Sequence, residues 1–397
     1  MKYLAVLGRQ PEISLAELCA LMPNSTFKRF GKVAIFSIAE LDSLPNISRL
    51  GGTIKLAVKL SETPLNYLRN LPGGKITIGI SDYSKSASAR TASGESLKLK
   101  KILVRHDRSV RVVESKDAVL ATATSLHNGL SGKNLRKVEL IKLDEEWFRV
   151  IGVQDIDAYS KRDQARPARD ARVGMLPPKL AQILINLCGN LPSGSRILDP
   201  FCGTGVVLQE ALLMGYQAYG TDLSDRMIEY SEKNLQWLVN SKNDTFGTIR
   251  DNRNELNEES HDRERDEAYL KNAFSLSAGD ATTFHWQPPI NAVACECFLG
   301  RPMSTIPPEI KLKSEKQDCS TIILGFLKNL STQISPNTPV IIAIPAWLRE
   351  NGTYSRLEIL DLITDLGYNV NNKSREGLLY YREGQIVARD IIILRKN

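Results

Sequence analysis

The sequence predicts an α/β fold with a C-terminal Rossmann-like domain, whose sheet is mostly parallel and doubly wound and ends in an antiparallel strand. A smaller α/β region precedes this domain. Two observations support this prediction: apolar strand-like segments alternate with helical segments from Arg196 onward, and a glycine turn at Gly203–Gly205 joins one such strand to a helix. A length of 397 residues is sufficient for two or three domains.

The composition is typical of globular proteins, with 42% hydrophobic and 24% charged residues. It excludes collagen, a disulfide scaffold and wholesale disorder. The longest apolar runs, such as Val340–Ala346, are far shorter than the ~20 residues that cross a bilayer. The first residues, MKYLAVLGRQPE, lack a basic segment and a cleavage site. We therefore expect a cytoplasmic protein with no membrane association.

The N-terminal region divides into two α/β segments, at 1–60 and 61–155. We expect Ser14 to cap the first helix, with Glu17 completing a capping box. The Leu71–Gly74 break opens the second segment. The expected elements, in order, are strand Tyr3–Leu7, helix Ser14–Leu21, strand Lys32–Ile38, a helix and strand toward Leu60, strand Lys75–Ser81, helix Ser93–Arg105, strand Val110–Val113, helix Ala118–Leu130 and the strand pair Lys137–Leu143 and Trp147–Val153.

Periodicity is lost over 156–178, which we interpret as a basic connector, and returns over 179–397, which we interpret as one domain. The segment 241–272 has almost no apolar residues, so we expect a disordered or helical insertion there. The terminal strand pair is expected to form a hairpin at a sheet edge. The expected elements are helix Lys179–Leu187, a strand, glycine turn and helix within the segment from Ser195 to Ala211, strand Tyr219–Thr221, strand Ala292–Cys295, helix Thr321–Leu330, strand Val340–Pro345, helix Arg356–Leu366, and strands Gly377–Arg382 and Val387–Arg395.

Positive charge is concentrated in the N-terminal half. Residues 1–175 hold 29 of the 52 Lys and Arg but only 18 of the 45 Asp and Glu, whereas the remainder hold 23 and 27. Neutralisation of phosphates supplies most non-specific affinity for nucleic acids, so this half is a candidate RNA-binding region. A solubilising surface is the alternative. In the connector, the candidate residues for phosphate contacts are Lys161, Arg162, Arg166, Arg169 and Arg172. The alternative is that these cations belong to a solvated linker that contacts no RNA.

The six cysteines include no CxxC pair, and the four histidines are not at ligand spacing from one another. We therefore expect reduced, mostly buried thiols and no metal.

The segment from Asp199 to Gly205, DPFCGTG, places two glycines where the backbone can closely approach a ligand. Asp222 ends the next strand, where a carboxylate can accept hydrogen bonds from both ribose hydroxyls of an adenosine cofactor. NAD or S-adenosylmethionine could occupy such a crevice. Asp199 would repel a pyrophosphate but attract an amino group, and Leu208 replaces the third glycine of GxGxxG, so S-adenosylmethionine is favoured.

Three short segments resemble motifs I, II and III of class I methyltransferases. They are DPFCGTG, the later GTD ending at Asp222 and the GDA at 279–281. The chain also resembles THUMP-containing tRNA guanosine-N2 methyltransferases in four segments. These are Arg162–Pro167, Gly174–Ala181, LGRQPEISLAEL near the start and YYREGQIVARDIIIL near the end. The resemblance implies a THUMP-like RNA-binding domain at 61–155, tRNA as partner and S-adenosylmethionine as cofactor. It implies cofactor-binding roles for Asp199, Phe201, Gly203, Gly205, Asp222 and Asp280, the last at the adenine.

The family's motif IV, (Asp/Asn)-Pro-Pro-(Tyr/Phe), is replaced here by ECFL, which places Glu296 at the acidic position. Glu296 can accept a hydrogen from an exocyclic amine, and Phe298 could stack on the base, a contribution of ~1–3 kcal/mol. The alternatives are a surface or salt-bridge role for the Glu296 carboxylate and core packing for Phe298. The Pro-Cys context of a pyrimidine-C5 nucleophile is absent at Cys297.

The leading hypothesis is therefore methylation of guanosine N2 in tRNA, with Glu296 and Phe298 as catalytic residues. The alternatives are a tRNA-binding protein with an inactive methyltransferase domain, a DNA adenine-N6 methyltransferase and a nicotinamide-dependent dehydrogenase. The resemblance leaves open which tRNA position is modified, whether one or two methyl groups are added and whether a small activating subunit is required. Nothing in the sequence demands more than a monomer.

Overall fold

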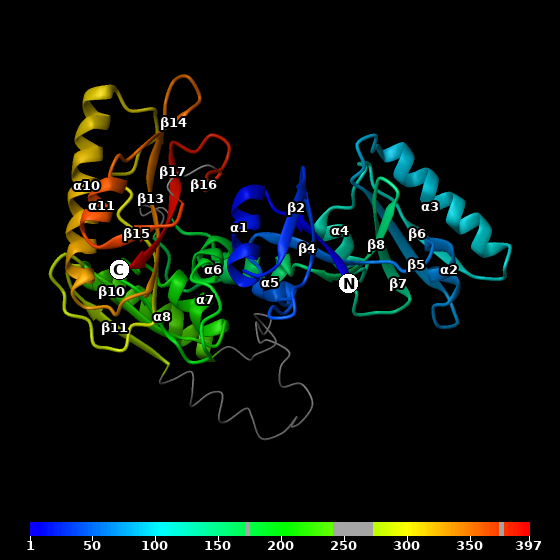
Figure 1. The fold of residues 1–397 in the computed structure, drawn as a ribbon, viewed down its shortest axis with the longest axis horizontal. Helices are drawn as coiled ribbons and strands as arrows, with labels where there is room; N and C mark the ends of the chain where they lie inside the picture. Colours follow the sequence, from blue (N-terminus) through cyan, green and yellow to red (C-terminus); the bar gives the residue numbers. More distant parts are fainter. Residues whose placement is uncertain (171–174, 241–272, 373–376) are drawn as a thin grey trace. The chain divides into compact units, whose positions relative to one another are not determined.

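The computed structural model describes residues 1–170, 175–240, 273–372 and 377–397, so the insertion expected at 241–272 lies outside the described residues. The chain forms two compact units, Met1–Asp157 and Ala158–Asn397, which we describe separately (Figure 1). The division lies close to the predicted end of the THUMP-like segment at residue 155. The predicted connector therefore belongs to the second unit for most of its length.

The first unit contains one sheet with the strand order β2-β3-β1-β4-β8-β7-β5-β6. Strand β4 pairs antiparallel with β8, which joins the segment 1–60 to the segment 61–155 in a single sheet. The two predicted N-terminal segments are therefore not separated into two sheets. The strands are β1 (Lys2–Leu7), β2 (Thr26–Phe30), β3 (Val33–Ser37), β4 (Thr53–Lys59), β5 (Ile76–Asp82), β6 (Val110–Val113), β7 (Lys137–Leu143) and β8 (Glu146–Val153).

Helices pack on this sheet through alternating apolar positions of its strands. Leu18 and Leu21 of α1 pack against Ala5 and Leu7 of β1, while Leu4 and Val6 of the same strand face a core on the other side. The expected capping box is wrong, because α1 begins at Pro11 and the Ser14 hydroxyl, inside the helix, donates to the carbonyl of Gly52 at 2.7 Å. The helices are α1 (Pro11–Leu21), the 3-10 helix η1 (Ile47–Arg49), α2 (Pro64–Arg69), α3 (Ala89–Val104) and α4 (Thr122–His127).

A fully buried ion pair links strands of this first sheet. The Lys55 ammonium lies 2.5 Å from a Glu139 carboxylate oxygen and also donates to the Leu120 carbonyl and the Ser125 hydroxyl. Both charged side chains have no exposed surface. The several hydrogen bonds offset part of the desolvation cost of burying two charges.

The second unit contains a mixed sheet with the strand order β11-β10-β9-β12-β13-β17-β15. The first five strands of this order are parallel, and β17 is antiparallel to β13, as the sequence predicts. The strands are β9 (Arg196–Asp199), β10 (Gln217–Asp222), β11 (Phe274–Ala278), β12 (Ala292–Glu296), β13 (Pro339–Leu348), β14 (Tyr354–Arg356), β15 (Tyr368–Val370), β16 (Leu379–Tyr380) and β17 (Val387–Lys396).

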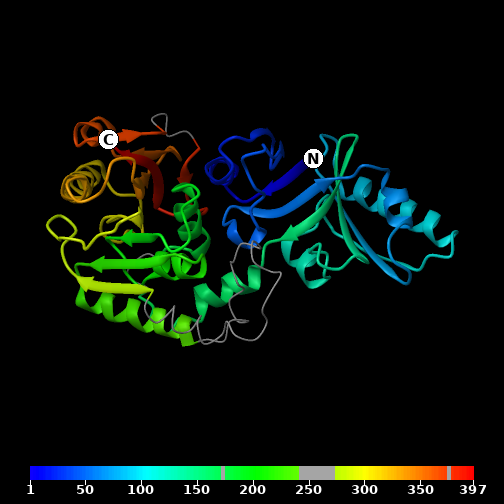
Figure 2. The ribbon, with the colours of Figure 1, turned by 60° about the horizontal axis from the view of Figure 1, so that its bottom comes forward.

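Helices cover both faces of the second sheet, which confirms the doubly wound architecture. Figure 2 shows α8 on one side of the parallel strands and α10 on the other. Phe326 and Leu327 of α10 pack in one core with Val293 of β12 and Ile342 of β13. The helices of this unit are α5 (Ile156–Gln164), α6 (Pro178–Leu187), α7 (Val206–Leu213), α8 (Asp225–Asn240), α10 (Glu309–Ser331) and α11 (Leu360–Asp365).

The terminal strand pair differs from its expected place at a sheet edge. Strand β16 pairs with β17 as a hairpin, but β17 lies between β13 and β15 inside the sheet. None of the described helices combines the length and apolarity needed to cross a membrane. All six cysteines are free, and the described residues contain no cluster of His, Cys, Asp and Glu suited to a metal ion.

Candidate functional site

The order of the parallel strands reverses at β9, which is the point where α/β sheets generally form a ligand crevice. The chain runs from β9 outward to β10 and β11 and then returns to β12 on the other side of β9. At such a reversal, the connections at the carboxyl ends of the two central strands diverge to opposite faces of the sheet. Asp199 is the last residue of β9 and Glu296 the last residue of β12. Both predicted acids therefore lie at the reversal, on adjacent strands.

The predicted glycine turn follows β9 and adopts the backbone conformation that requires glycine. Gly203 has a φ of +51° and Gly205 a φ of +80°, both in the left-handed region. A side chain on Gly205 would meet the Ser231 hydroxyl at 2.9 Å, whereas the nearest atom to one on Gly203 lies 4.0 Å away. Gly205 is therefore required for packing against α8, and Gly203 leaves the backbone open to a ligand.

Asp222 connects three of the predicted motifs at the ends of β9, β10 and β11. Its Oδ2 accepts a hydrogen bond from the Gly203 amide at 2.9 Å, and its carbonyl accepts one from the Gly279 amide at 2.9 Å. Asp280 is exposed and accepts bonds from both the amide and the hydroxyl of Thr282 on one oxygen. Burial raises the pKa of Asp222, although two backbone hydrogen bonds to its carboxylate act in the opposite direction.

Asp199 is a buried carboxyl group with 3% of its surface exposed. Its Oδ1 accepts a hydrogen bond from the Phe201 amide at 3.1 Å, and no ion pair is formed with a described cation. Burial raises its pKa well above the usual range, and the negative charges of Asp222 and Glu296 add to this increase. A ligand that brings a positive charge to this position would therefore stabilise the ionised carboxylate.

Glu296 forms an ion pair, which the sequence analysis held open as an alternative without identifying the partner. The Arg389 Nε atom, on β17, lies 2.6 Å from Glu296 Oε1, and the two side chains are 5% and 14% exposed. Burial raises the pKa of Glu296, and Arg389 opposes this increase. The available signal was the Arg389-Asp390 pair within an otherwise apolar run near the C-terminus. An unpaired charge inside such a strand is costly, so a partner across the sheet could have been sought.

The two predicted aromatic residues occupy different environments. Phe201 is partly buried and packs edge-on against Phe326, with ring centroids 5.2 Å apart. Phe298 is 37% exposed, so part of its side chain is accessible to a ligand. Their roles at a cofactor and at a base remain predictions.

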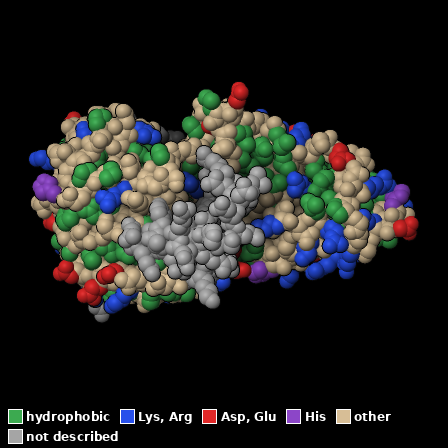
Figure 3. Space-filling model, turned by 90° about the horizontal axis from the view of Figure 1, so that it is seen from below, with side chains coloured by type: hydrophobic (Ala, Val, Ile, Leu, Met, Phe, Trp, Pro, Cys, Tyr) green, Lys and Arg blue, Asp and Glu red, His purple; other side chains and the backbone are tan. Residues whose placement is uncertain are grey.

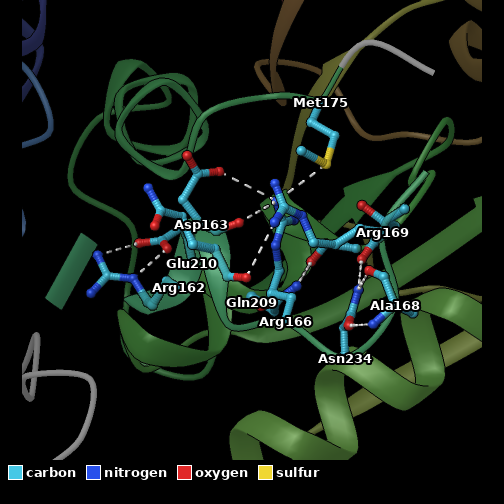
Figure 4. Close-up of polar contacts among 12 residues, drawn as sticks. Arg162, Asp163, Arg166, Ala168, Arg169, Met175, Gln209, Glu210 and Asn234 are labelled. Atoms are coloured by element: carbon cyan, nitrogen blue, oxygen red, sulfur yellow. Dashed lines mark hydrogen bonds and ion pairs between the residues drawn. The ribbon is translucent and has the colours of Figure 1, made fainter. Parts of the chain in front are cut away.

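The connector residues do not form the continuous exposed row that the sequence suggested (Figure 4). Arg162 is 3% exposed, and its Nε atom lies 2.7 Å from Glu210 Oε1 on α7. Arg166 is equally buried, with its Nη2 atom 3.4 Å from Asp163 Oδ1. The expectation that these two arginines contact phosphate is corrected, because both are enclosed beside carboxylates.

The other connector cations have different outcomes. Lys161 and Arg169 are exposed, so their phosphate contacts stay predictions. Arg172 lies outside the described residues. The connector thus combines two structural arginines with two exposed cations among its described residues.

Cations also gather on the surface of the first unit. Figure 3 shows Lys and Arg side chains concentrated toward the end of this unit drawn at the right. Helix α3 contributes Lys98 and Lys101, both exposed, and Lys85 is exposed just before this helix. This distribution suits a polyanionic partner.

Comparison with known proteins supports the motif assignments. The family model UPF0020, an RMKL-like methyltransferase domain, matches residues 166–305. A tRNA (guanine(10)-N2)-dimethyltransferase from Methanothermobacter thermautotrophicus is 49% identical over 76 residues, which are 19% of this chain and 22% of the relative. The corresponding enzyme from Pyrococcus abyssi is 27% identical over 246 residues, 60% of this chain and 68% of the relative. The chain thus spans about a fifth of the first relative's length.

Solved structures also show similarity. The crystal structure of TrmN from Thermus thermophilus aligns over 100% of both chains, with 16% identity and a TM-score of 0.49.

Proposed function

We propose that the chain methylates the exocyclic N2 of a guanosine in tRNA, using S-adenosylmethionine, because residues 166–305 match the family model of UPF0020, an RMKL-like methyltransferase domain. The observation that carries this proposal is the position of Asp199, Gly203, Asp222 and Glu296 at the reversal of strand order. The curated relatives are named as tRNA (guanine(10)-N2)-dimethyltransferases, which supports this choice of acceptor.

The residues at the crevice fit S-adenosylmethionine. Asp199 is a buried carboxyl group without a cationic partner among the described residues, and the amino acid part of the cofactor carries an ammonium group. Gly203 leaves room for close approach, Asp222 can accept from ribose hydroxyls and Asp280 can contact the adenine. When bound, the cofactor supplies an electrophilic methyl group, whose C–S bond breaks as the amine nitrogen forms the new C–N bond.

The chain's own residues orient the acceptor and receive the proton. Glu296 can accept a hydrogen bond from the N2 amine and take its proton as the nitrogen gains the methyl group, directly or through water. Phe298 offers an exposed ring for stacking on the base. Correct positioning of the amine relative to the methyl group supplies most of the remaining rate enhancement.

The first unit is proposed to bind the tRNA. Its exposed lysines and the positive balance of residues 1–175 support phosphate contacts, with Lys161 and Arg169 adding to them. The THUMP-like identity of 61–155 stays a prediction. A tRNA substrate is consistent with activity in the cytoplasm, which we propose as the location.

The test is to incubate the purified chain with unmodified tRNA and S-adenosylmethionine carrying a labelled methyl group, and then to digest the RNA to nucleosides. We expect labelled N2-methylguanosine or its dimethyl form, and no label in duplex DNA added as a competitor. If no tRNA yields either nucleoside, the proposal is wrong.

A second candidate is a tRNA-binding protein with an inactive methyltransferase domain. The observation that favours it is the ECFL segment at 296–299, which lacks both prolines and the terminal aromatic of the family pattern. This alternative gives salt-dependent tRNA binding without turnover. Glu296→Ala should leave tRNA binding intact in both cases and abolish methylation only if the chain is an enzyme; methylation at the full rate in this variant would remove Glu296 from the mechanism.

A further inference from the structure

Arg389 reaches Glu296 from two strands away. Glu296 is in register with Ala343 of the intervening strand β13, whereas Arg389 is in register with Pro345, two residues further along β13. The Arg389 side chain therefore crosses the middle of β13, near Ala343–Pro345, to reach the last residue of the shorter β12. This arrangement brings a cation to the same end of the sheet as the cofactor motifs.

The ion pair is specific in its geometry. Arg389 donates through Nε to Glu296 Oε1 at 2.6 Å, a short charge-assisted hydrogen bond. Among the described residues, Glu296 Oε2 and the two Nη atoms of Arg389 form no other hydrogen bond. One carboxylate oxygen is thus held while the other is available to an incoming donor.

A cation is costly where Arg389 lies. It is 4% exposed and precedes the apolar run Ile391–Ile393 in the same strand. Burial of a charge without a partner costs several kcal/mol, and an ion pair does not by itself favour the fold over apolar residues. Stability alone therefore does not account for this pair.

We propose that Arg389 is a positioning residue for methyl transfer, which keeps the Glu296 carboxylate ionised and oriented so that Oε2 faces the acceptor amine. This inference rests on the proposed function. Glutamate has one more methylene than the aspartate of the family pattern, and thus one more rotatable bond. The hydrogen bond to Oε1 restricts that added freedom.

The surrounding charges explain why a cation is needed. The other charged groups that act on this site are carboxylates: Asp199 at the end of β9, with Asp222 of β10 beyond it. The thiols of Cys295 and Cys297 flank Glu296 on its own chain segment. Without Arg389, the burial that raises the pKa of Glu296 would be unopposed and would favour its protonated form, which cannot accept the amine proton.

The experiment measures single-turnover methylation of tRNA against pH for the wild type, Arg389→Gln and Arg389→Lys, at saturating donor and tRNA. Because the donor is saturating, protonation of Asp199 changes the KM for the donor but not the measured rate. Arg356→Gln is the matched control, because Arg356 approaches Asp390, the next residue on β17, at 3.5 Å and does not pair with Glu296. Thermal melting and the KM values for donor and tRNA are recorded for each variant.

For Arg389→Gln we expect a rate about 100-fold lower, with the acid limb of the pH profile moved to higher pH and both KM values within a few-fold of the wild type. Arg389→Lys retains the cation and is expected to recover part of the rate and move the acid limb back. Arg356→Gln is expected to keep the acid limb of the wild type.

An active wild type whose acid limb is unchanged in Arg389→Gln overturns the positioning role alone. A higher KM for tRNA in Arg389→Gln at an unchanged rate also overturns the positioning role, because it would indicate that Arg389 contacts RNA. If Arg389→Gln does not fold, Arg389→Lys decides through its rate: a rate equal to that of the wild type shows that the Nε–Oε1 hydrogen bond does not orient Glu296 and overturns the positioning role. A wild type that methylates no tRNA refutes the proposed function and this inference with it.

Discussion

Of the alanine substitutions at Gly203 and Gly205, the second should lower stability more and the first should weaken ligand binding more. Both glycines have positive φ, where an L-residue costs roughly 1–2 kcal/mol. A Cβ on Gly205 would additionally lie 2.9 Å from the Ser231 hydroxyl and 3.3 Å from its Cα. We therefore expect Gly203→Ala to lower the free energy of unfolding by about 1–2 kcal/mol and Gly205→Ala by about 2–4 kcal/mol.

Ligand binding should show the reverse sensitivity. A Cβ on Gly203 has only the Phe201 carbonyl, at 4.0 Å, as a near neighbour and so projects into open space where we expect the ligand. We expect Gly203→Ala to weaken S-adenosylmethionine binding by at least tenfold, or about 1.4 kcal/mol, in isothermal titration calorimetry.

Stability is measured by urea unfolding of the second unit, followed by the fluorescence of the buried Trp286 and Trp347 in a Trp147→Phe background. A Gly203→Ala variant that binds the cofactor as tightly as the wild type refutes the assignment of this turn. A Gly205→Ala variant as stable as Gly203→Ala refutes the packing role.

Three further predictions use other parts of the chain. Burial raises the pKa of Asp199 in the free protein, and the ammonium group of a bound ligand would lower it again. S-adenosylmethionine binding should therefore release protons and become tighter as pH rises. Calorimetry in buffers of different ionisation enthalpy measures the proton release, and an equal release from Asp199→Asn would contradict the prediction. Lys55→Met leaves Glu139 buried without its cation and should destabilise the first unit by about 3–5 kcal/mol in urea unfolding. The control Lys59→Met, at a more exposed pair, should cost under about 1 kcal/mol. Equal losses in the two variants would contradict the argument from burial. Replacing Lys161 or Arg169 by Ala should lower the slope of log Kd for tRNA against log salt concentration by about one each, and an unchanged slope removes that residue from the phosphate contacts.

Local patterns were sufficient to predict most of the second unit. The glycine turn, the acid at the end of the following strand and the strand at Ala292–Cys295 depend on short-range geometry, so the motif residues occur at the ends of β9, β10 and β12 as expected. The resemblance to motif IV placed Glu296 just after this last strand, and the structure has it as the last residue of β12. The sequence pattern also predicted the antiparallel terminal strand.

The sequence pattern could not predict which distant strands and side chains pair with one another. The Glu296–Arg389 ion pair depends on the registers of β12, β13 and β17, which no local signal specifies. The single sheet of the first unit depends in the same way on the pairing of β4 with β8.

The connector shows a second limit. A run of arginines has the same composition whether it is solvated or enclosed, and only the position of Glu210 on α7 determines that Arg162 is buried. Composition therefore identified the charge but not its partner.

The most direct test of the central claim is a crystal structure with S-adenosylhomocysteine, the product of methyl transfer from the donor. We expect the ligand between the carboxyl ends of β9 and β12, in contact with Asp199 and Asp222 and with its sulfur on the side of Glu296. A ligand bound elsewhere, or one whose sulfur faces away from Glu296, would contradict the assignment of this crevice as the site of methyl transfer.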